Sequence, residues 1–220
     1  MMNKKILCIV SLLIFLTTNL YSQQQTPFGD EINNFRKLDS QDIAKDVILF
    51  TGSSSIRMWE NLQQSFPEYR VLNRGFGGST LADLDLYLAD IVFPYQPKQI
   101  FIYSGENDIA VDSISAEQVL TRFQTVFQKI RSKLPDVPVE YISIKPSPSR
   151  LKFLPVVKEA NELIRNYLRG QSNTHFIDVF SSMIDSNGQP KKGIFIEDDL
   201  HMNSKGYEIW QKVIQPYLIK

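Results

Sequence analysis

The chain has little of several residue types on which common kinds of protein depend. It holds one cysteine in 220 residues, so it cannot form an internal disulfide or a cysteine-rich zinc site. It also has only two histidines, and its 24 basic residues balance its 24 acidic ones without a basic patch. We therefore expect no nucleic-acid partner, because a phosphate backbone attracts proteins through concentrated positive charge.

The first 22 residues have the layout of a secretory signal peptide. Lys4 and Lys5 precede an apolar run over residues 6–16, and a polar stretch then ends at the small residue Ser22. The run falls well short of the roughly 20 residues that a membrane-spanning helix needs. We predict a signal peptide over residues 1–22, export to the periplasm or the exterior, and no stable membrane insertion after cleavage. An uncleaved membrane tether is the less favoured alternative.

Residues 23–220 are expected to fold as a single domain, since their number lies within the usual range for one. Hydrophobic residues make up 43% of the chain, enough to build a core. Without residues 1–22 the chain keeps 22 basic and 24 acidic residues, a formal charge of −2, and it loses its one cysteine, Cys8. A chain without cysteine has no thiol that an oxidising compartment could oxidise, which is compatible with the predicted export.

Five apolar runs rich in β-branched and aromatic residues predict β-strands. They do not alternate strictly with polar residues, which is typical of strands covered on both faces in a parallel sheet. The runs are residues 47–51, 70–73, 99–104, 137–144 and 174–179.

Helical patterns lie between these runs. Ser115 with Gln118 predicts a capped helix start, residues 151–169 predict a helix that ends at Gly170, and Asn203 predicts the start of the last helix. Residues 80–91 indicate a further helix, and residues 23–46 a lead-in with a possible short one. Such alternation predicts a three-layer, doubly wound sheet of five strands, with ligands bound at the carboxyl ends of the strands.

Hydroxyl groups and glycines follow the first two predicted strands. Ser53, Ser54 and Ser55 could supply a nucleophile, although on this segment alone a helix cap is the favoured interpretation. They do not form a G-x-S-x-G elbow, because Ile56 stands where its second glycine would be. After the second strand, the cluster of glycines at 75, 77 and 78 either exposes backbone N–H groups to a ligand or forms a tight turn.

Polar side chains follow the later strands. Asn107 could donate an amide N–H to a developing oxyanion, or belong with Asp108 to a turn. Asp198 and His201 are three residues apart, so a turn would let the carboxylate hold one imidazole nitrogen and leave the other as a base. His175 lies in an apolar run, and we predict that it is a buried structural histidine.

Taken together, these segments resemble the blocks of the SGNH, or GDSL-type, esterase and lipase superfamily, from about Val47 to Leu218. Gly52-Ser53-Ser54 is similar to the family's Gly-Asp-Ser, with Ser53 in place of the aspartate. Gly105-Glu106-Asn107-Asp108 matches Gly-x-Asn-Asp, and Asp198 to His201 matches Asp-x-x-His. The resemblance implies an α/β fold: a flavodoxin-like α/β/α sandwich around a five-stranded parallel sheet.

The resemblance also implies an activity and its residues. Ser54 would be the nucleophile, His201 the base, Asp198 its orienting acid, and Gly78 and Asn107 oxyanion donors. No cofactor or metal is implied. Because His201 must be neutral to accept a proton, activity should fall in acidic solution.

We expect a serine esterase for small acyl groups, with O-acetyl groups on carbohydrates as the favoured substrates. One alternative is a lysophospholipase or platelet-activating-factor-acetylhydrolase-like lipid esterase, and another is a non-catalytic glycan- or lipid-binding module. The loop from Lys145 to Arg150 faces the same edge and could contact substrate, or could merely lead into a helix; it is not included among the predicted site residues.

Overall fold

The structure, a computed structural model, describes residues 27–220 and contains a five-stranded sheet. The strands are β1 (Ile48–Gly52), β2 (Val71–Gly75), β3 (Gln99–Tyr103), β4 (Val139–Ile142) and β5 (Thr174–Ile177). They stand in the order β2-β1-β3-β4-β5, and all neighbours run parallel. The predicted five-stranded parallel sheet is thus confirmed. The predicted signal peptide lies outside the described residues.

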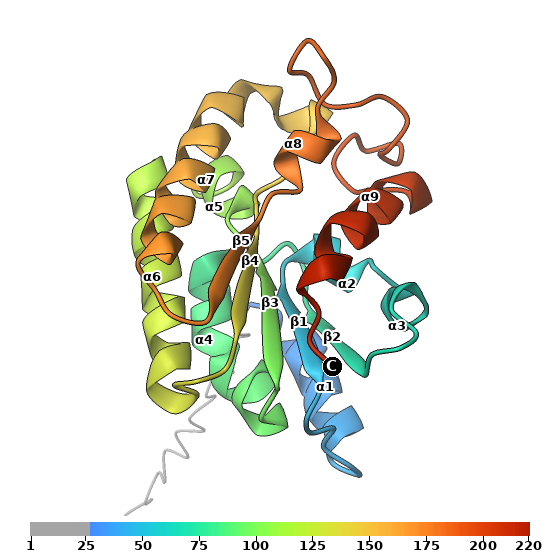
Figure 1. The fold of residues 1–220 in the computed structure, drawn as a ribbon, viewed down its shortest axis with the longest axis vertical. Coiled ribbons are helices and arrows are strands. Elements are labelled where there is room, and N and C mark those ends of the chain that lie inside the picture. The colour runs from blue at the N-terminus through green and yellow to red at the C-terminus, as the bar shows by residue number, and fades with distance from the viewer. Residues whose placement is uncertain (1–26) are drawn as a thin grey trace, which may run out of the picture.

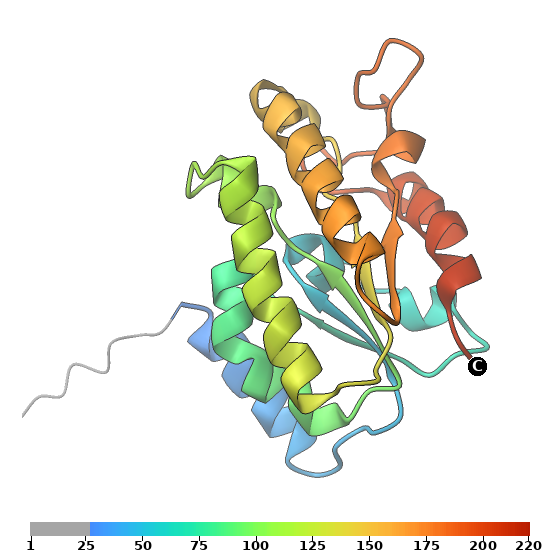
Figure 2. The same cartoon turned by 60° about the vertical axis from the view of Figure 1, so that its left-hand side comes forward.

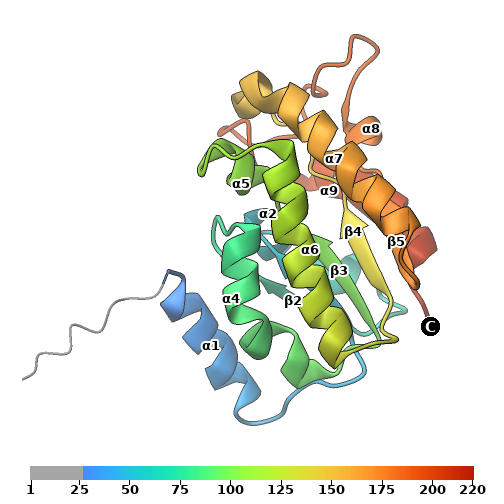
Figure 3. The same ribbon diagram turned by 90° about the vertical axis from the view of Figure 1, so that its left-hand side faces the viewer.

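Helices cover both faces of the sheet and make three layers (Figures 1 and 3). One face carries α1 (Gly29–Asp39), α4 (Leu81–Ile91), α6 (Ala116–Lys133) and α7 (Leu154–Arg169). The other carries α2 (Ser54–Arg57), α3 (Leu62–Ser65) and α9 (Ser204–Ile214). Shorter elements complete the chain: α5 (Glu106–Ala110), α8 (Phe180–Met183) and the 3₁₀ turns η1 (Phe93–Tyr95), η2 (Pro148–Phe153) and η3 (Gln215–Tyr217).

The central strands are buried on both faces, which explains their continuous apolar sequence. In β3, Ile100 and Ile102 pack beneath the α4, α6 and α7 layer, whereas Phe101 and Tyr103 pack toward α9. Figure 2 shows these two helical layers on either side of the strands. Alternate side chains of one strand therefore enter two separate cores.

Two helices begin at the predicted capping residues. Ser115 caps α6 in a capping box with Gln118, and Asn203 caps α9 by accepting N–H groups of the first turn. The helix predicted over residues 151–169 begins later, at Leu154, after η2. Pro155 explains the delay, because it lacks the N–H that a longer helix would need there, whereas the first turn tolerates it.

The predicted burial of His175 is wrong. Its side chain is 59% exposed, and its Nδ1 lies 2.8 Å from Oε2 of the buried Glu140. The reason is the place of β5, which is an edge strand and pairs only with β4. An apolar run at a sheet edge can leave one of its side chains in solvent.

Within residues 27–220, no helix combines the length and the apolar character that crossing a lipid bilayer requires.

Candidate active site

The predicted site residues gather where the strand order reverses. β1 and β3 are neighbours in the middle of the sheet, and the chain leaves β1 toward β2 on one side and β3 toward β4 on the other. A crevice forms outside the carboxyl ends of strands at such a switch point. Ser54 begins α2, which follows β1, and Asn107 lies in α5, which follows β3; Figure 1 shows both helices at this end of the sheet.

Gly52 allows the turn that carries Ser54. Its φ is +120°, and a Cβ at this position would lie 1.9 Å from the carbonyl oxygen of Tyr103. Glycine is therefore required where β1 ends against β3. The next residue, Ser53, donates its backbone N–H to the same carbonyl at 2.9 Å, and α2 begins directly afterwards at Ser54.

Ser54, His201 and Asp198 form a continuous chain of hydrogen bonds. Ser54 Oγ lies 2.8 Å from His201 Nε2, and His201 Nδ1 lies 2.5 Å from Asp198 Oδ2. An ionised carboxylate can only accept, so Nδ1 carries the imidazole proton and Nε2 is left to accept one from Ser54. This is the geometry of a hydroxyl nucleophile, a base and a residue that orients the base.

The carboxylate of Asp198 is held by its own turn. Its Oδ1 accepts the backbone N–H groups of Leu200 at 2.9 Å and His201 at 2.8 Å. Burial acts to raise the pKa of Asp198, but the bonds from His201 and Leu200 outweigh it and hold that pKa below its usual range. The group is therefore ionised when it faces the imidazole.

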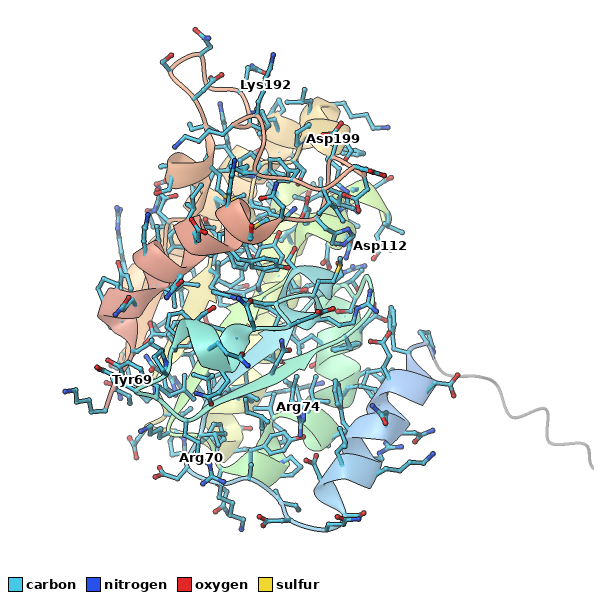
Figure 4. All side chains as sticks on the ribbon, turned by 90° about the vertical axis from the view of Figure 1, so that its right-hand side faces the viewer. Tyr69, Arg70, Arg74, Asp112, Lys192 and Asp199 are labelled. Carbon is cyan, nitrogen blue, oxygen red and sulfur yellow. The ribbon has the colours of Figure 1, made fainter. Side chains whose placement is uncertain are left out.

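The turn itself is fixed on both sides. An isolated β-bridge joins Phe195 to Met202, and Ile196 donates its N–H to the carbonyl of His201 at 2.8 Å. Asn203 donates its side-chain amide to the carbonyl of Phe195 at 3.0 Å while it caps α9. In Figure 4, Asp199 of this turn lies far from Tyr69 and Arg70, which precede β2 at the opposite end of the sheet.

Asn107 and Gly78 lie together on the other side of Ser54. The Asn107 amide donates to Ser53 Oγ at 2.8 Å and to the carbonyl of Ser79 at 3.1 Å. A Cβ at Gly78 would lie 3.7 Å from Asn107 Nδ2, so the two are neighbours. The structure thus brings all five predicted site residues to one place, and Ser53 contacts Asn107 instead of capping α2.

Asp108 belongs elsewhere. Its side chain is fully buried, accepts the N–H of Leu81 and pairs with Arg122 at 2.8 Å. Burial raises the pKa of this carboxyl against the effect of Arg122. Asp108 ties α5 to α4 and α6, and so supports the loop that carries Asn107.

Sequence reasoning missed the support that α1 gives to the glycine loop. Glu31 Oε2 accepts the backbone N–H of Gly77 at 2.9 Å. Gly77 has a φ of +34°, and a Cβ there would lie 2.2 Å from the ring of Phe28, which packs edge-on against Phe76. No motif in residues 23–46 indicated these contacts.

Sequence reasoning also missed a buried ionic cluster beneath the site. Lys145 Nζ lies 2.9 Å from Glu106 Oε2, and Ser147 donates to Glu106 Oε1 at 2.6 Å. Burial acts to raise the pKa of Glu106, but the charges of Lys145 and Arg150 outweigh it and lower that pKa. We name Glu106, Lys145, Ser147 and Arg150 the Glu106 cluster.

Comparison with known proteins gives one family. The model of the GDSL-like lipase/acylhydrolase family matches residues 45–209. The alpha1 subunit of platelet-activating factor acetylhydrolase IB from Rattus norvegicus is 26% identical over 178 residues, which cover 77% of this chain and 73% of the relative.

Two solved structures illustrate the shared fold. A Streptococcus pneumonia protein named for platelet activating factor has a TM-score of 0.77 and 23% identity, covering 88% of this chain and 94% of its own. A catalytic mutant of an acetylxylan esterase from Geobacillus stearothermophilus has a TM-score of 0.63 and 14% identity, covering 79% and 94%.

Proposed function

The chain belongs to the GDSL-like lipase/acylhydrolase family and is a carboxylic ester hydrolase, and we propose that it removes small acyl groups through an acyl-enzyme on Ser54. The observation that supports this most directly is the hydrogen-bonded chain from Ser54 through His201 to Asp198. A binding module without catalysis, the alternative of another class, would have no use for such a chain.

In the proposed reaction, Ser54 Oγ bonds to the ester carbonyl carbon while His201 Nε2 takes the hydroxyl proton. The carbonyl electron pair moves to oxygen, then returns and breaks the bond to the alcohol, which leaves with the proton from His201. Water then attacks the acyl-enzyme with His201 again as base, which releases the acid and restores Ser54.

The oxyanion would be held by the backbone N–H groups of Ser54 and Gly78 and by the side chain of Asn107. The positions of these groups support this role. Asn107 Nδ2 donates to Ser53 Oγ, next to Ser54, and would lie 3.7 Å from a Cβ at Gly78. Removal of one such donor typically lowers the rate by about 10²–10³-fold.

We propose acetyl groups on carbohydrates as the substrate class. Polar groups gather at Ser54, among them His201, Asn107 and Asp198, whose side chain is 41% exposed, and polar groups suit a sugar more than a long acyl chain. The structural neighbour from Geobacillus stearothermophilus is an acetylxylan esterase, which agrees with this choice.

A lipid ester is the second candidate, and specific observations favour it too. Val111, Leu151 and Ile196 are exposed apolar residues on the segments that follow β3, β4 and β5. The relative from Rattus norvegicus is an acetylhydrolase of platelet-activating factor. An apolar rim could hold the chains of a lipid substrate.

The deciding experiment compares p-nitrophenyl esters from acetate to octanoate, followed by acetylated xylooligosaccharides and lysophospholipids. We expect kcat/KM to fall steeply beyond butyrate and sugar acetates to release acetate. Sustained activity at octanoate, with fatty acid release from lysophospholipid, would instead establish the lipid candidate. The Ser54→Ala variant is the control for hydrolysis that does not use the site.

We also propose that the protein is exported, on the basis of the pattern in residues 1–22 alone. Expression of the full chain with a C-terminal tag should give a product shortened near Ser22 outside the cytoplasm. An intact N-terminus on the purified protein would contradict this.

A further inference from the structure

The segment from Lys145 to Arg150 touches both halves of the site. On one side Lys145 Nζ donates to the carbonyl of Leu200 at 2.8 Å, and Ser149 donates its N–H and hydroxyl to the carbonyl of Asp199. These carbonyls belong to the turn that carries Asp198 and His201. On the other side Arg150 Nη2 donates to Asn107 Oδ1 at 2.8 Å.

The contact with Arg150 bears on how Asn107 can act. An asparagine amide can be turned by 180°, and only one of the two orientations presents N–H groups toward an oxyanion. A guanidinium only donates, so the atom facing Arg150 must be the amide oxygen, and Nδ2 must face Ser53 and Gly78. The carbonyl of Ser79, which only accepts, lies 3.1 Å from Nδ2 and favours the same orientation.

The charge of Arg150 adds a second effect. The Glu106 cluster contains two cations, Lys145 and Arg150, around one carboxylate. Lys145 Nζ lies 2.9 Å from Glu106 Oε2, whereas Arg150 Nη1 lies 3.8 Å from Glu106 Oε1 and is therefore the more weakly paired cation. Positive charge therefore remains beside the amide oxygen, and the Arg150 side chain is only 17% exposed. At low local dielectric this charge polarises the amide and strengthens its N–H groups as donors.

We propose that Arg150 is a positioning residue for the oxyanion site: it fixes the orientation of the Asn107 amide and strengthens its donation to the transition state. This inference rests on the proposed function. Arg150 acts through Asn107 and makes no bond to the reacting atoms. Its effect should therefore disappear when the Asn107 amide is removed.

A double-mutant cycle tests this directly. Arg150→Met, Asn107→Ala and the combination are assayed with p-nitrophenyl acetate, whose activated leaving group keeps slow variants measurable. Arg150→Met should lower kcat by about 10- to 100-fold, less than the ~10²–10³ for loss of a donor, with KM within about twofold of wild type. In the Asn107→Ala background the same change should lower kcat by less than about twofold.

Lys152→Met is the matched control. It removes a cation from the same turn η2, but Lys152 is exposed and stacks on Phe153, away from Asn107. It should leave kcat and KM unchanged. Should Arg150→Met melt near the assay temperature, Arg150→Ala, which likewise removes both the donor and the charge, takes its place in the cycle with the same criterion.

The proposal is overturned if the Arg150 substitution costs as much in the Asn107→Ala background as in wild type, or if it raises KM while kcat stays unchanged. Failure of the proposed function looks different. In that case wild-type protein would not hydrolyse p-nitrophenyl acetate, or Ser54→Ala would hydrolyse it at nearly the wild-type rate. Either outcome would be seen whatever residue stands at position 150.

Discussion

Ser54 Oγ and His201 Nε2 lie 2.8 Å apart although 147 residues separate them in the chain. Ser54 lies two residues after the end of β1 in the middle of the sheet, whereas His201 comes after β5 at its edge. The chain from α8 to α9 therefore has to return across the carboxyl ends of β4 and β3. The pairing of nucleophile and base depends on the path of this connection.

Substitution of the three adjacent serines separates their roles. Ser54→Ala should lower kcat for p-nitrophenyl acetate by about 10³-fold or more, because it removes the hydroxyl that bonds to His201. Ser53→Ala should cost about fivefold, the worth of its one hydrogen bond from Asn107. Ser55→Ala should stay near wild type. Near-normal activity in Ser54→Ala would show that the nucleophile is another residue.

Patterns of local sequence predicted the sheet, the helix caps and the residues at the strand ends. These features arise from short-range periodicity and from turn chemistry, which a single sequence displays. The approach of Asp198 to His201 was also predictable, since a three-residue spacing on a turn fixes it.

Contacts between distant segments were beyond such patterns. Nothing near Glu31 or Phe28 indicates that they hold Gly77, and nothing near Lys145 indicates a carboxylate partner at Glu106. The exposure of His175 likewise depends on β5 being the edge strand, which only the strand order reveals. These features require tertiary structure.

The substitution Asp198→Asn tests the orientation of His201. An amide at 198 can turn an N–H toward His201 Nδ1 and stabilise the tautomer whose Nε2 cannot accept the serine proton. We expect kcat to fall by about 10²–10⁴-fold. Because the pKa of Asp198 is held below its usual range, its carboxylate stays ionised from about pH 6 to 8, and the variant should be slower than wild type throughout that range.

Measurement of kcat across that range is the check. The substitution Asp199→Asn, at the neighbouring residue whose carbonyl accepts from Ser149, keeps the backbone of the turn and serves as the control. Equal kcat values for wild type and Asp198→Asn within this range would show that the Asp198 carboxylate does not orient His201.

The contact between Glu31 and Gly77 predicts a role for α1 in the rate. Glu31→Ala removes the acceptor of the Gly77 N–H, so the loop with Gly78 becomes less well fixed, and kcat should fall about three- to tenfold. The adjacent Asp30→Ala, on the exposed side of α1, should not change kcat. Equal rates for the two variants would show that α1 does not support the loop.

The pair of Glu106 and Lys145 predicts a characteristic dependence of stability on pH. Glu106→Gln leaves the fully buried Lys145 without its carboxylate, which should cost about 3–5 kcal/mol of unfolding free energy at pH 7. Since the folded-state pKa of Glu106 is lowered, the stabilisation from its charge is complete above the unfolded-state carboxyl pKa of about 4.3 and is lost as pH falls through the folded-state value.

The gap between wild type and Glu106→Gln should therefore narrow below about pH 4.3 in chemical denaturation. Adding Lys145→Met should recover part of the loss at pH 7, because no buried charge is then left unpaired. Lys129→Met, which breaks the largely exposed pair with Asp85, is the control and should cost at most about 1 kcal/mol. Fully additive losses in the double variant would mean that Glu106 and Lys145 stabilise the fold independently. The ion pair of 2.9 Å would then not be what fixes Lys145 where it donates to the carbonyl of Leu200 beneath the site.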